Sequence, residues 1–258
     1  SLLQETCFSI VGNRAYSDYG KQVTEQFSSA LAAHFVIVSG MAEGIDTIAH
    51  HAAIRSQKRT IAVLGTPLNK VYPASNVSLF HRLCRDHLVI SEFPLHAKGS
   101  PRHFPQRNRI VTGLSCGLLV SEARLKSGSL ISAQLACEQN RDVFAIPGSI
   151  FSKHHSGVHS LIQDGAKLVH CPDDILVDYD ITPISNSDSC APPPSSVSLD
   201  EQDQLIFTLL QSQDYHLDDL IEKTNLPVNL LLQKLSFLEC HGLIRAGVDQ
   251  FFSIQSRP

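Results

Sequence analysis

The sequence predicts an α/β fold: a mostly parallel sheet with helices on both faces, followed by a linker and a small winged-helix-like domain. Three features of the chain lead to this prediction. Short apolar runs alternate with longer amphipathic segments up to about residue 175, a Pro/Ser-rich stretch follows, and the remainder holds short helical patterns and a terminal hairpin pattern. Alternation of strands with helices is typical of a parallel sheet that is covered on both faces.

Seven apolar runs are expected to form the strands of this sheet. Each run is almost continuously hydrophobic, as a strand buried on both faces must be. The runs occupy residues 8–11, 35–38, 60–64, 88–90, 117–120, 143–146 and, more weakly, 167–169. The segments between them predict helices over residues 16–33, 45–56, 76–85, 107–114 and 129–140. Together these elements define a first domain over residues 1–179.

Residues 180–198 interrupt the pattern. They are rich in Pro and Ser and poor in core-forming side chains, which predicts a linker. Helices are then expected over residues 199–212, 217–224 and 228–240. A turn at Gly247 separates two last apolar segments, 242–245 and 250–254. Three short helices and a hairpin over residues 199–258 describe a winged-helix-like domain.

The composition is typical of a cytoplasmic protein. Hydrophobic residues make up 43% of the chain, but no apolar run approaches the ~18 residues of a membrane span. The first residues have neither the basic flank nor the apolar core of a signal peptide. The seven cysteines never form a C-x-x-C pair, which fits reduced thiols better than a disulfide framework or a zinc site. We expect no membrane contact, no metal and no cofactor.

The net charge of −4 conceals a strong asymmetry. Residues 1–171 carry 17 Lys and Arg against 11 Asp and Glu, whereas residues 172–258 carry 4 against 14. A basic body with an acidic tail region predicts an anionic partner for the body alone.

The stretch over residues 102–110 indicates what that partner is. It combines three arginines with a histidine, two amides and an aromatic ring, and residues 93–121 contain no acidic side chain. Guanidinium groups match phosphate oxygens, and an aromatic face accepts any base, so the stretch favours a nucleic acid. A solvated cationic helix face is the alternative. The residues concerned are Arg102, His103, Phe104, Arg107, Asn108 and Arg109.

Small residues follow most of the predicted strands. In an open parallel sheet ligands bind outside the carboxyl ends of the strands, where small residues let backbone N–H groups approach an anion. These small residues therefore form a rim that favours ligand binding at this edge of the sheet. The alternative is that they only allow the tight turns between strands and helices. The segments are Gly12-Asn13-Arg14, Ser39-Gly40-Met41-Ala42, Gly65-Thr66-Pro67, Ser91-Glu92, Ser121-Glu122-Ala123 and Pro147-Gly148-Ser149.

Two predicted helix starts carry further polar groups. Ser127-Gly128-Ser129 opens a helix directly after Lys126, and hydroxyl and N–H groups there suit a phosphate, although a plain serine cap explains them too. Asp46 and His50 lie one turn apart on another helix. We expect them to form a structural Asp–His hydrogen bond that holds the preceding turn, in preference to a catalytic pair.

The common nucleotide and hydrolase motifs are missing. The sequence has no G-x-x-x-x-G-K-[ST], no G-x-G-x-x-G at the first helix and no G-x-S-x-G. His154, His155 and His159 have no Cys or carboxylate at useful spacing, so they do not predict a metal site.

Several short stretches nevertheless match a known family. They are Val11-Gly12-Asn13-Arg14, residues 39–46, Val71-Tyr72-Pro73, Ser91-Glu92, residues 104–110, Glu122-Ala123, residues 127–133, residues 145–148 and Gly165-Ala166. In this order and spacing they resemble the DprA/Smf family, the bacterial DNA-processing proteins of natural transformation, over residues 7–176. Residues 199–254 resemble the winged-helix tail of many members.

The resemblance implies an extended Rossmann-like fold that binds single-stranded DNA without reading its sequence. It also implies a homodimer that protects incoming single strands and hands them to the RecA recombinase, with no known catalysis. Phe104 would pack against a base. The other DNA-binding residues carried over by position are Arg14, Ser39, Gly40, Lys98, Arg102, Arg107, Asn108, Arg109, Lys126, Ser127, Gly128 and Ser129.

Two other functions are weighed against this one. Phosphoribohydrolase-like enzymes on a related fold use a P-G-G-x-G-T loop before a catalytic glutamate, and residues 125–130 lack that loop. Glu92 and Glu122 could still act as acid or base groups, but we expect both to be buried structural carboxylates and the protein not to be an enzyme. Duplex reading by the winged helix is opposed by its acidic balance, which favours a protein-interaction role.

The sequence also departs from the family pattern. Glu43 stands where members usually have Arg or Lys, which removes a positive charge from the rim. His159 stands where Asn is common. The sequence does not include the N-terminal helical domain of many members. We expect Glu43 to weaken DNA binding.

Overall fold

The computed structural model describes residues 4–181, 200–212, 215–224, 226–240, 243–246 and 251–254. The chain divides into two compact units, residues 1–185 and 186–258. The predicted linker lies outside the described residues except for Asp180 and Ile181, and the predicted turn at Gly247 lies outside them as well. No helix among the described residues is long and apolar enough to cross a membrane.

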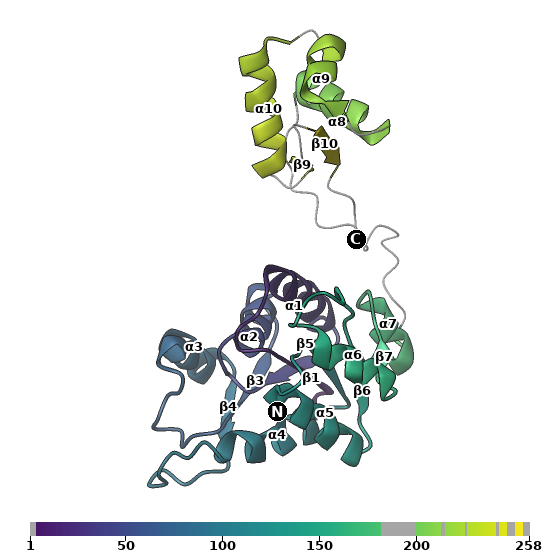
Figure 1. The fold of residues 1–258 in the computed structure, drawn as a ribbon. Helices are drawn as coiled ribbons and strands as arrows, with labels where there is room; N and C mark the ends of the chain where they lie inside the picture. Colours follow the sequence, from purple (N-terminus) through teal and green to yellow (C-terminus); the bar gives the residue numbers. More distant parts are fainter. Residues whose placement is uncertain are drawn as a thin grey trace. The chain divides into compact units, whose positions relative to one another are not determined.

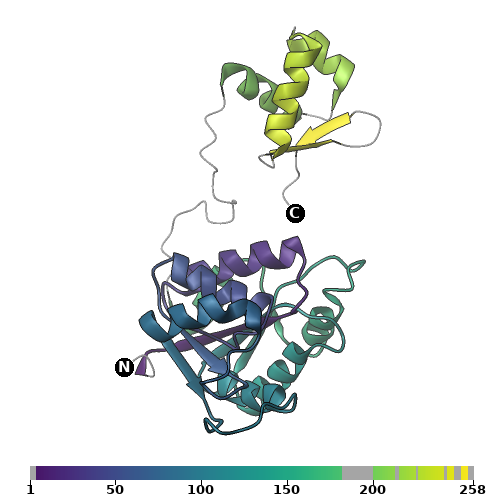
Figure 2. The same ribbon diagram turned by 90° about the vertical axis from the view of Figure 1, so that its left-hand side faces the viewer.

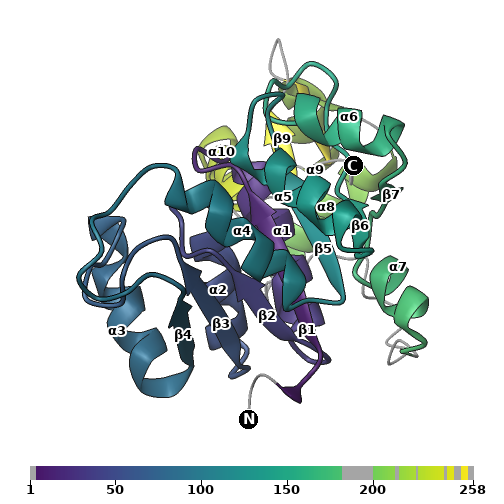
Figure 3. The ribbon, with the colours of Figure 1, turned by 90° about the horizontal axis from the view of Figure 1, so that it is seen from below.

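A seven-stranded sheet forms the first unit, in the order β4-β3-β2-β1-β5-β6-β7. Every neighbouring pair is parallel. The order reverses between β1 and β5, as in Rossmann-like sheets, and Figure 3 shows the strands fanning out in this order. The strands are β1 (Cys7–Gly12), β2 (Val36–Ser39), β3 (Thr60–Leu64), β4 (Leu88–Ser91), β5 (Gly117–Glu122), β6 (Asp142–Ala145) and β7 (Lys167–Leu168).

Helices cover both faces of this sheet. α1 and α2 lie above it in Figure 1, and α4 and α5 lie below. The predicted α/β class, with a Rossmann-like sheet and helices on both faces, is confirmed. The helices are α1 (Asp18–Leu31), α2 (Ile45–Arg55), α3 (Val77–Asp86), α4 (His103–Gly113), α5 (Gly128–Glu138), α6 (Ser156–Gln163) and the short α7 (Asp173–Leu176), with single 3-10 turns at Ala74–Asn76 and Val177–Tyr179.

The side chains of β1 alternate between the two cores on either side of the sheet. Phe8 and Ile10 pack with α1 and α2, whereas Cys7 and Val11 pack with α4 and α5. This alternation follows from the two-residue repeat of a strand. Because each fully buried large apolar side chain contributes about 1.5–3 kcal/mol, the two cores fix the sheet firmly. The carboxyl ends of the strands are thereby held on one common edge.

The second unit is a small winged helix. Its strands form an antiparallel sheet in the order β8-β10-β9, and the buried faces of its helices share one apolar core that includes Ile206, Leu220 and Leu235. Figure 2 shows this unit from the side. Its elements are α8 (Glu201–Ser212), β8 (Tyr215–His216), α9 (Leu217–Thr224), α10 (Val228–Cys240), β9 (Ile244–Ala246) and β10 (Phe251–Ile254).

The sequence-based assignment of helices and strands fails at four places. Helix α4 begins at His103, although residues 102–106 were not expected to be helical. Pro105 is tolerated there because the first N–H groups of a helix have no partner within the helix. Helices α6 and α7 and the short strand β8 were not predicted. All three are too short to show a clear periodicity.

Candidate nucleic-acid interface

A small pocket opens where β1, β2 and β3 end. Arg14 comes two residues after β1, Gly40 directly follows β2 and Gly65 directly follows β3. Helix α4 closes the pocket with Phe104 and Arg107. Ala42, Glu43, Tyr72 and Pro73 complete the lining. Four residues predicted to bind DNA, namely Arg14, Gly40, Phe104 and Arg107, thus meet in one place.

Arg107 forms the floor of the pocket. It is only 4% exposed, and its guanidinium donates to the carbonyl oxygens of Gly40 and Val63. Burial lowers the pKa of Arg107, and the nearby Asp46 carboxylate opposes that shift. A Cβ at Gly40 would lie 2.5 Å from Nη2 of Arg107. The glycine is therefore required, because any side chain would displace the guanidinium.

Asp46 holds the turn after β2 from the other side. Its Oδ2 accepts hydrogen bonds from the backbone N–H groups of Gly40 (3.1 Å) and Ala42 (3.4 Å). Burial raises the pKa of Asp46, while the Arg107 charge and these N–H groups act in the opposite direction. The predicted Asp46–His50 hydrogen bond is wrong, because His50 Nδ1 lies 2.8 Å from Thr60 Oγ1 and bonds to it instead.

Two aromatic rings form the wall of the pocket. The ring centroids of Tyr72 and Phe104 are 5.3 Å apart with planes tilted by 44°. The Arg14 guanidinium carbon lies 5.6 Å from the Phe104 centroid, within the range of a cation–π interaction. A Cβ at Gly65 would lie 2.6 Å from Cδ1 of Phe104, so the ring rests directly on the backbone. The wall can offer an aromatic face and a cation to the same nucleotide.

The start of α5 adjoins α4 on the same edge of the sheet. Ser127 caps the helix by accepting from the Ser129 N–H, and the two hydroxyl oxygens lie 2.7 Å apart. Asn108 Nδ2 of α4 donates to the Gly128 carbonyl oxygen at 3.4 Å. Lys126 is exposed beside this cap. The predicted group at residues 126–129 is therefore joined to α4 through Asn108.

The remaining predicted residues differ in how accessible they are. Lys98 and Arg102 are exposed just before α4. Arg109 is exposed on α4, but its guanidinium is bonded to Glu92. Ser39 is fully buried and its Oγ donates to the Ile10 carbonyl oxygen at 2.7 Å. The Ser39 hydroxyl is thus engaged in a hydrogen bond within the sheet. Of these two residues, only Gly40 lines the pocket.

The two strand-end glutamates behave differently. Glu122 is completely buried and accepts hydrogen bonds from the backbone N–H and the hydroxyl of Ser17, at the amino end of α1. The prediction of a buried structural carboxylate is correct for Glu122. It is wrong for Glu92, which is exposed and paired with Arg109. Glu92 directly follows the edge strand β4, which has only one neighbouring strand to shield it.

Sequence reasoning missed the second aromatic ring of the pocket. Tyr72 belongs to a segment that matches the DprA/Smf pattern, but no periodicity indicates that it folds against Phe104, 32 positions later in the chain. The available signal was a tyrosine in a segment rich in turn formers, with Pro67 and Asn69 before it and Pro73 after it. Glu43, which was noted as a departure from the pattern, lines the same pocket and accepts from Ser75 Oγ at 2.9 Å.

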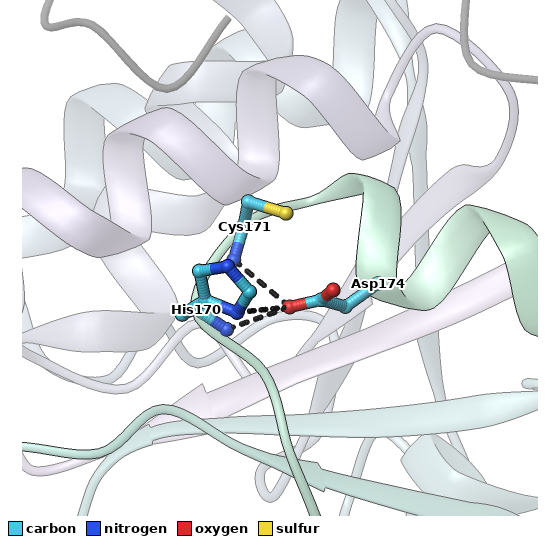
Figure 4. A group of neighbouring side chains, drawn as sticks. All are labelled: His170, Cys171 and Asp174. Carbon is cyan, nitrogen blue, oxygen red and sulfur yellow. Dashed lines mark hydrogen bonds and ion pairs between the residues drawn. The ribbon is translucent and has the colours of Figure 1, made fainter.

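One group of possible metal ligands exists among the described residues: His170, Cys171 and Asp174. Figure 4 shows that Asp174 Oδ2 is already engaged, since it accepts from the backbone N–H groups of His170 (2.9 Å) and Cys171 (3.2 Å) and lies 2.8 Å from His170 Nδ1. These bonds close the turn between β7 and α7. The group is therefore explained as a capped turn, remote in sequence from the pocket.

A Rossmann-like sheet whose carboxyl edge carries cations and aromatic rings, joined to a winged helix, defines a class of nucleic-acid-handling proteins. The model of the family described as DNA recombination-mediator protein A matches residues 1–180, and that of the DprA winged helix domain matches residues 191–249. The chain belongs to the DNA recombination-mediator protein A (DprA/Smf) family.

Individual relatives support this assignment. DNA processing protein DprA of Streptococcus pneumoniae is 46% identical over 179 residues, which cover 69% of this chain and 64% of that protein. Protein Smf of Escherichia coli is 39% identical over 245 residues, covering 92% of this chain and 65% of that protein. The chain thus spans slightly less than two thirds of the length of these curated relatives.

Solved structures of two relatives superimpose on this chain. The S. pneumoniae DprA structure gives a TM-score of 0.67 at 47% identity, covering 69% of this chain and 62% of that one. A structure of DNA processing protein A from Helicobacter pylori gives a TM-score of 0.65 at 30% identity, covering 70% and 84%. The latter concerns the single-stranded DNA binding mode of the H. pylori protein.

Proposed function

We propose that this chain binds single-stranded DNA, without reading its sequence, at the pocket between the ends of β1–β3 and α4. The observation that carries the proposal is the meeting of Arg14, Arg107, Tyr72 and Phe104 in one pocket. A cation with an aromatic wall suits a phosphate and an adjacent base, and stacking tolerates every base. The H. pylori relative, whose structure concerns single-stranded DNA binding, supports the same choice.

Within the pocket, Arg14 and Arg107 have different proposed roles. Arg14 is exposed, so its guanidinium can move to bind a phosphate. Arg107 is nearly buried and bonded to two backbone carbonyl groups, so it contributes a fixed positive charge beneath the ligand. Phe104 supplies the base-packing face. The exposed Lys98, Arg102 and Lys126 extend the positive rim, with Asn108, Arg109 and the residue 127–129 helix start beside them.

The nucleotide-enzyme alternative receives less support. In Rossmann-like sheets a nucleotide phosphate binds at the amino end of the helix that follows the first strand. Here the buried Glu122 carboxylate accepts from Ser17 at the amino end of α1. A Cβ at Gly20 would lie only 2.6 Å from Oε2 of Glu122, so the carboxylate is packed tightly against this helix. A phosphate would have to displace a fixed negative charge.

The wider role follows from family membership. We propose that the protein protects single strands in the cytoplasm and transfers them to the RecA recombinase, and that it does so as a homodimer without catalysis. The winged helix is proposed to bind a protein, because residues 199–258 carry 4 basic against 9 acidic side chains, which opposes contact with phosphates.

Fluorescence anisotropy tests the proposal. A labelled single strand of about 30 nucleotides and the matching duplex are titrated at two salt concentrations, since displaced counterions make phosphate binding salt-dependent. Tighter, salt-sensitive binding of the single strand, with similar affinity for unrelated sequences, is expected. Equal affinity for the duplex, a strong sequence preference or a salt-independent affinity would contradict the proposal.

A further inference from the structure

Two neighbouring loops present an unusual surface beside the pocket. They are the β5–α5 loop (residues 123–127) and the β6–α6 loop (residues 146–155), here called the outer rim. At their tips Leu125, Ile150 and Phe151 are 64%, 79% and 91% exposed. Exposed apolar side chains that gather in one place usually mark a binding surface.

Hydrogen bonds hold the loops of the outer rim in place, although their tips are exposed. In the β6–α6 loop, Ser149 accepts from the N–H groups of Phe151 and Ser152, and Ser152 accepts from the N–H of His155. Tyr19 Oη donates to the Pro147 carbonyl oxygen at 2.7 Å, which ties the loop to α1. Phe151 makes no ring contact with another described residue, so the anchored loop holds its ring out to solvent.

Asn13 connects the outer rim to the pocket. Its Oδ1 accepts from the Arg124 N–H at 3.1 Å and its Nδ2 donates to the His154 carbonyl oxygen at 3.3 Å. The Arg124 guanidinium also lies 3.0 Å from His154 Nε2, which holds the two loops together. The next residue in the chain is Arg14, which lines the pocket. The outer rim and the pocket are therefore linked through the buried side chain of Asn13.

The charge of the outer rim selects the partner. Arg124, Lys126 and Lys153 are exposed, and residues 143–163 contain no acidic side chain. The nearest carboxylate, that of Glu122, is fully buried and bonded to Ser17. Cations around a protruding aromatic ring fit a chain of phosphates with exposed bases. An apolar protein surface would leave these cations unpaired at the contact.

We infer that the outer rim is a second contact for the same single strand, in which Phe151 stacks on a base and Lys153 and Arg124 bind the flanking phosphates. The inference rests on the proposed function, because it extends the strand from the pocket past Asn13. It implies that affinity depends on length: a short oligonucleotide fills only the pocket, whereas a longer one also reaches Phe151.

The test titrates labelled oligothymidylates from about 4 to about 30 nucleotides against the full chain and its Phe151→Ala variant. Phe151→Ala is expected to bind long oligomers about tenfold more weakly and the shortest ones unchanged, because one stacked base is lost. Phe151→Trp should restore the affinity. Val177→Ala, which truncates another exposed apolar residue (60% exposed), is the matched control and should change nothing.

The outcomes separate this inference from the proposed function. If the wild-type chain binds single strands but Phe151→Ala binds every length equally well, the inference is overturned while the proposed function stands. If Phe151→Ala changes only the oligomeric state in sedimentation, the outer rim contacts protein, and the inference is likewise overturned. If the wild-type chain binds no single strand of any length, both fail.

Discussion

Replacing Arg14 by alanine tests the electrostatic part of the pocket. The Arg14 side chain is exposed at the pocket and forms no ion pair with any described residue, so its charge is available to a phosphate. Its guanidinium carbon lies 5.6 Å from the centroid of the Phe104 ring, and its charge helps to lower the pKa of the buried Arg107. The substitution therefore removes the proposed phosphate contact and the cation–π contact with Phe104, but no ion pair with a described residue.

The size of the effect follows from counterion release. Each phosphate contact on a single strand adds about 0.7 to the slope of log affinity against log salt concentration. Between about 50 and 200 mM salt, a fourfold change, the loss of one contact should make the fall in affinity about 2.6-fold smaller than in the wild type. Loss of the cation–π contact leaves the Phe104 ring less ordered. This should weaken the binding free energy by about a further 0.5–1 kcal/mol at every salt concentration.

Anisotropy titrations across a salt series measure both quantities. Arg59→Ala is the matched control, because Arg59 is exposed, precedes β3 at the opposite edge of the sheet and is paired only with the exposed Glu5. Arg59→Ala removes the same charge and should keep the wild-type slope. A wild-type slope for Arg14→Ala, or an equal decrease in both variants, would refute a phosphate contact at Arg14.

Three further predictions concern the pocket and the fold. Gly65→Val should displace the Phe104 ring, because a Cβ at this position would lie 2.6 Å from it. Single-strand binding should become about tenfold weaker, while thermal unfolding shows that the protein is still folded. An unchanged affinity would argue against base packing at this ring. Glu43→Gln should raise affinity about threefold by removing a negative charge from the pocket, and the same exchange at Glu25, on α1, should have no effect. Burial lowers the pKa of His50 from 6.5 to about 3. As the pH falls, the His50 imidazole is therefore protonated in the unfolded chain before it is protonated in the folded one. The free energy of unfolding should therefore decrease, by about 1.4 kcal/mol per pH unit at most, as the pH falls from 6.5 towards 3. His50→Gln should flatten this dependence in denaturant titrations, and an unaltered pH profile would show that His50 does not cause it.

Periodicity predicted the sheet well, because a strand such as β3 is buried on both faces and can hold only apolar or small side chains. Helices with a long apolar stripe were equally predictable. Helix α6 was not predictable, since its eight residues include two turn formers, Ser156 and Gly157, and show too little periodicity. Its position is fixed by tertiary contacts, such as the hydrogen bond from the Gly157 N–H to the Ala123 carbonyl oxygen.

The residue types of the site were predictable, but their individual roles were not. The sequence places Ser39 and Arg107 among cations and small residues at strand ends, and such positions suggest exposed ligands. Burial decides otherwise: the Ser39 hydroxyl bonds to β1, and Arg107 bonds to two backbone carbonyl groups. Tyr72 reaches Phe104 only because the chain folds back between β3 and α3, which no local pattern encodes.

Photocrosslinking tests the central proposal, that a single strand lies in this pocket, most directly. A single strand with 5-iodouracil substituted for thymine is irradiated with the full chain, and the crosslinked peptides are identified by mass spectrometry. Crosslinks to the peptides that carry Tyr72 and Phe104 are expected, and Arg14→Ala should reduce their yield. Crosslinks confined to residues 200–254, with none near the pocket, would contradict the proposal.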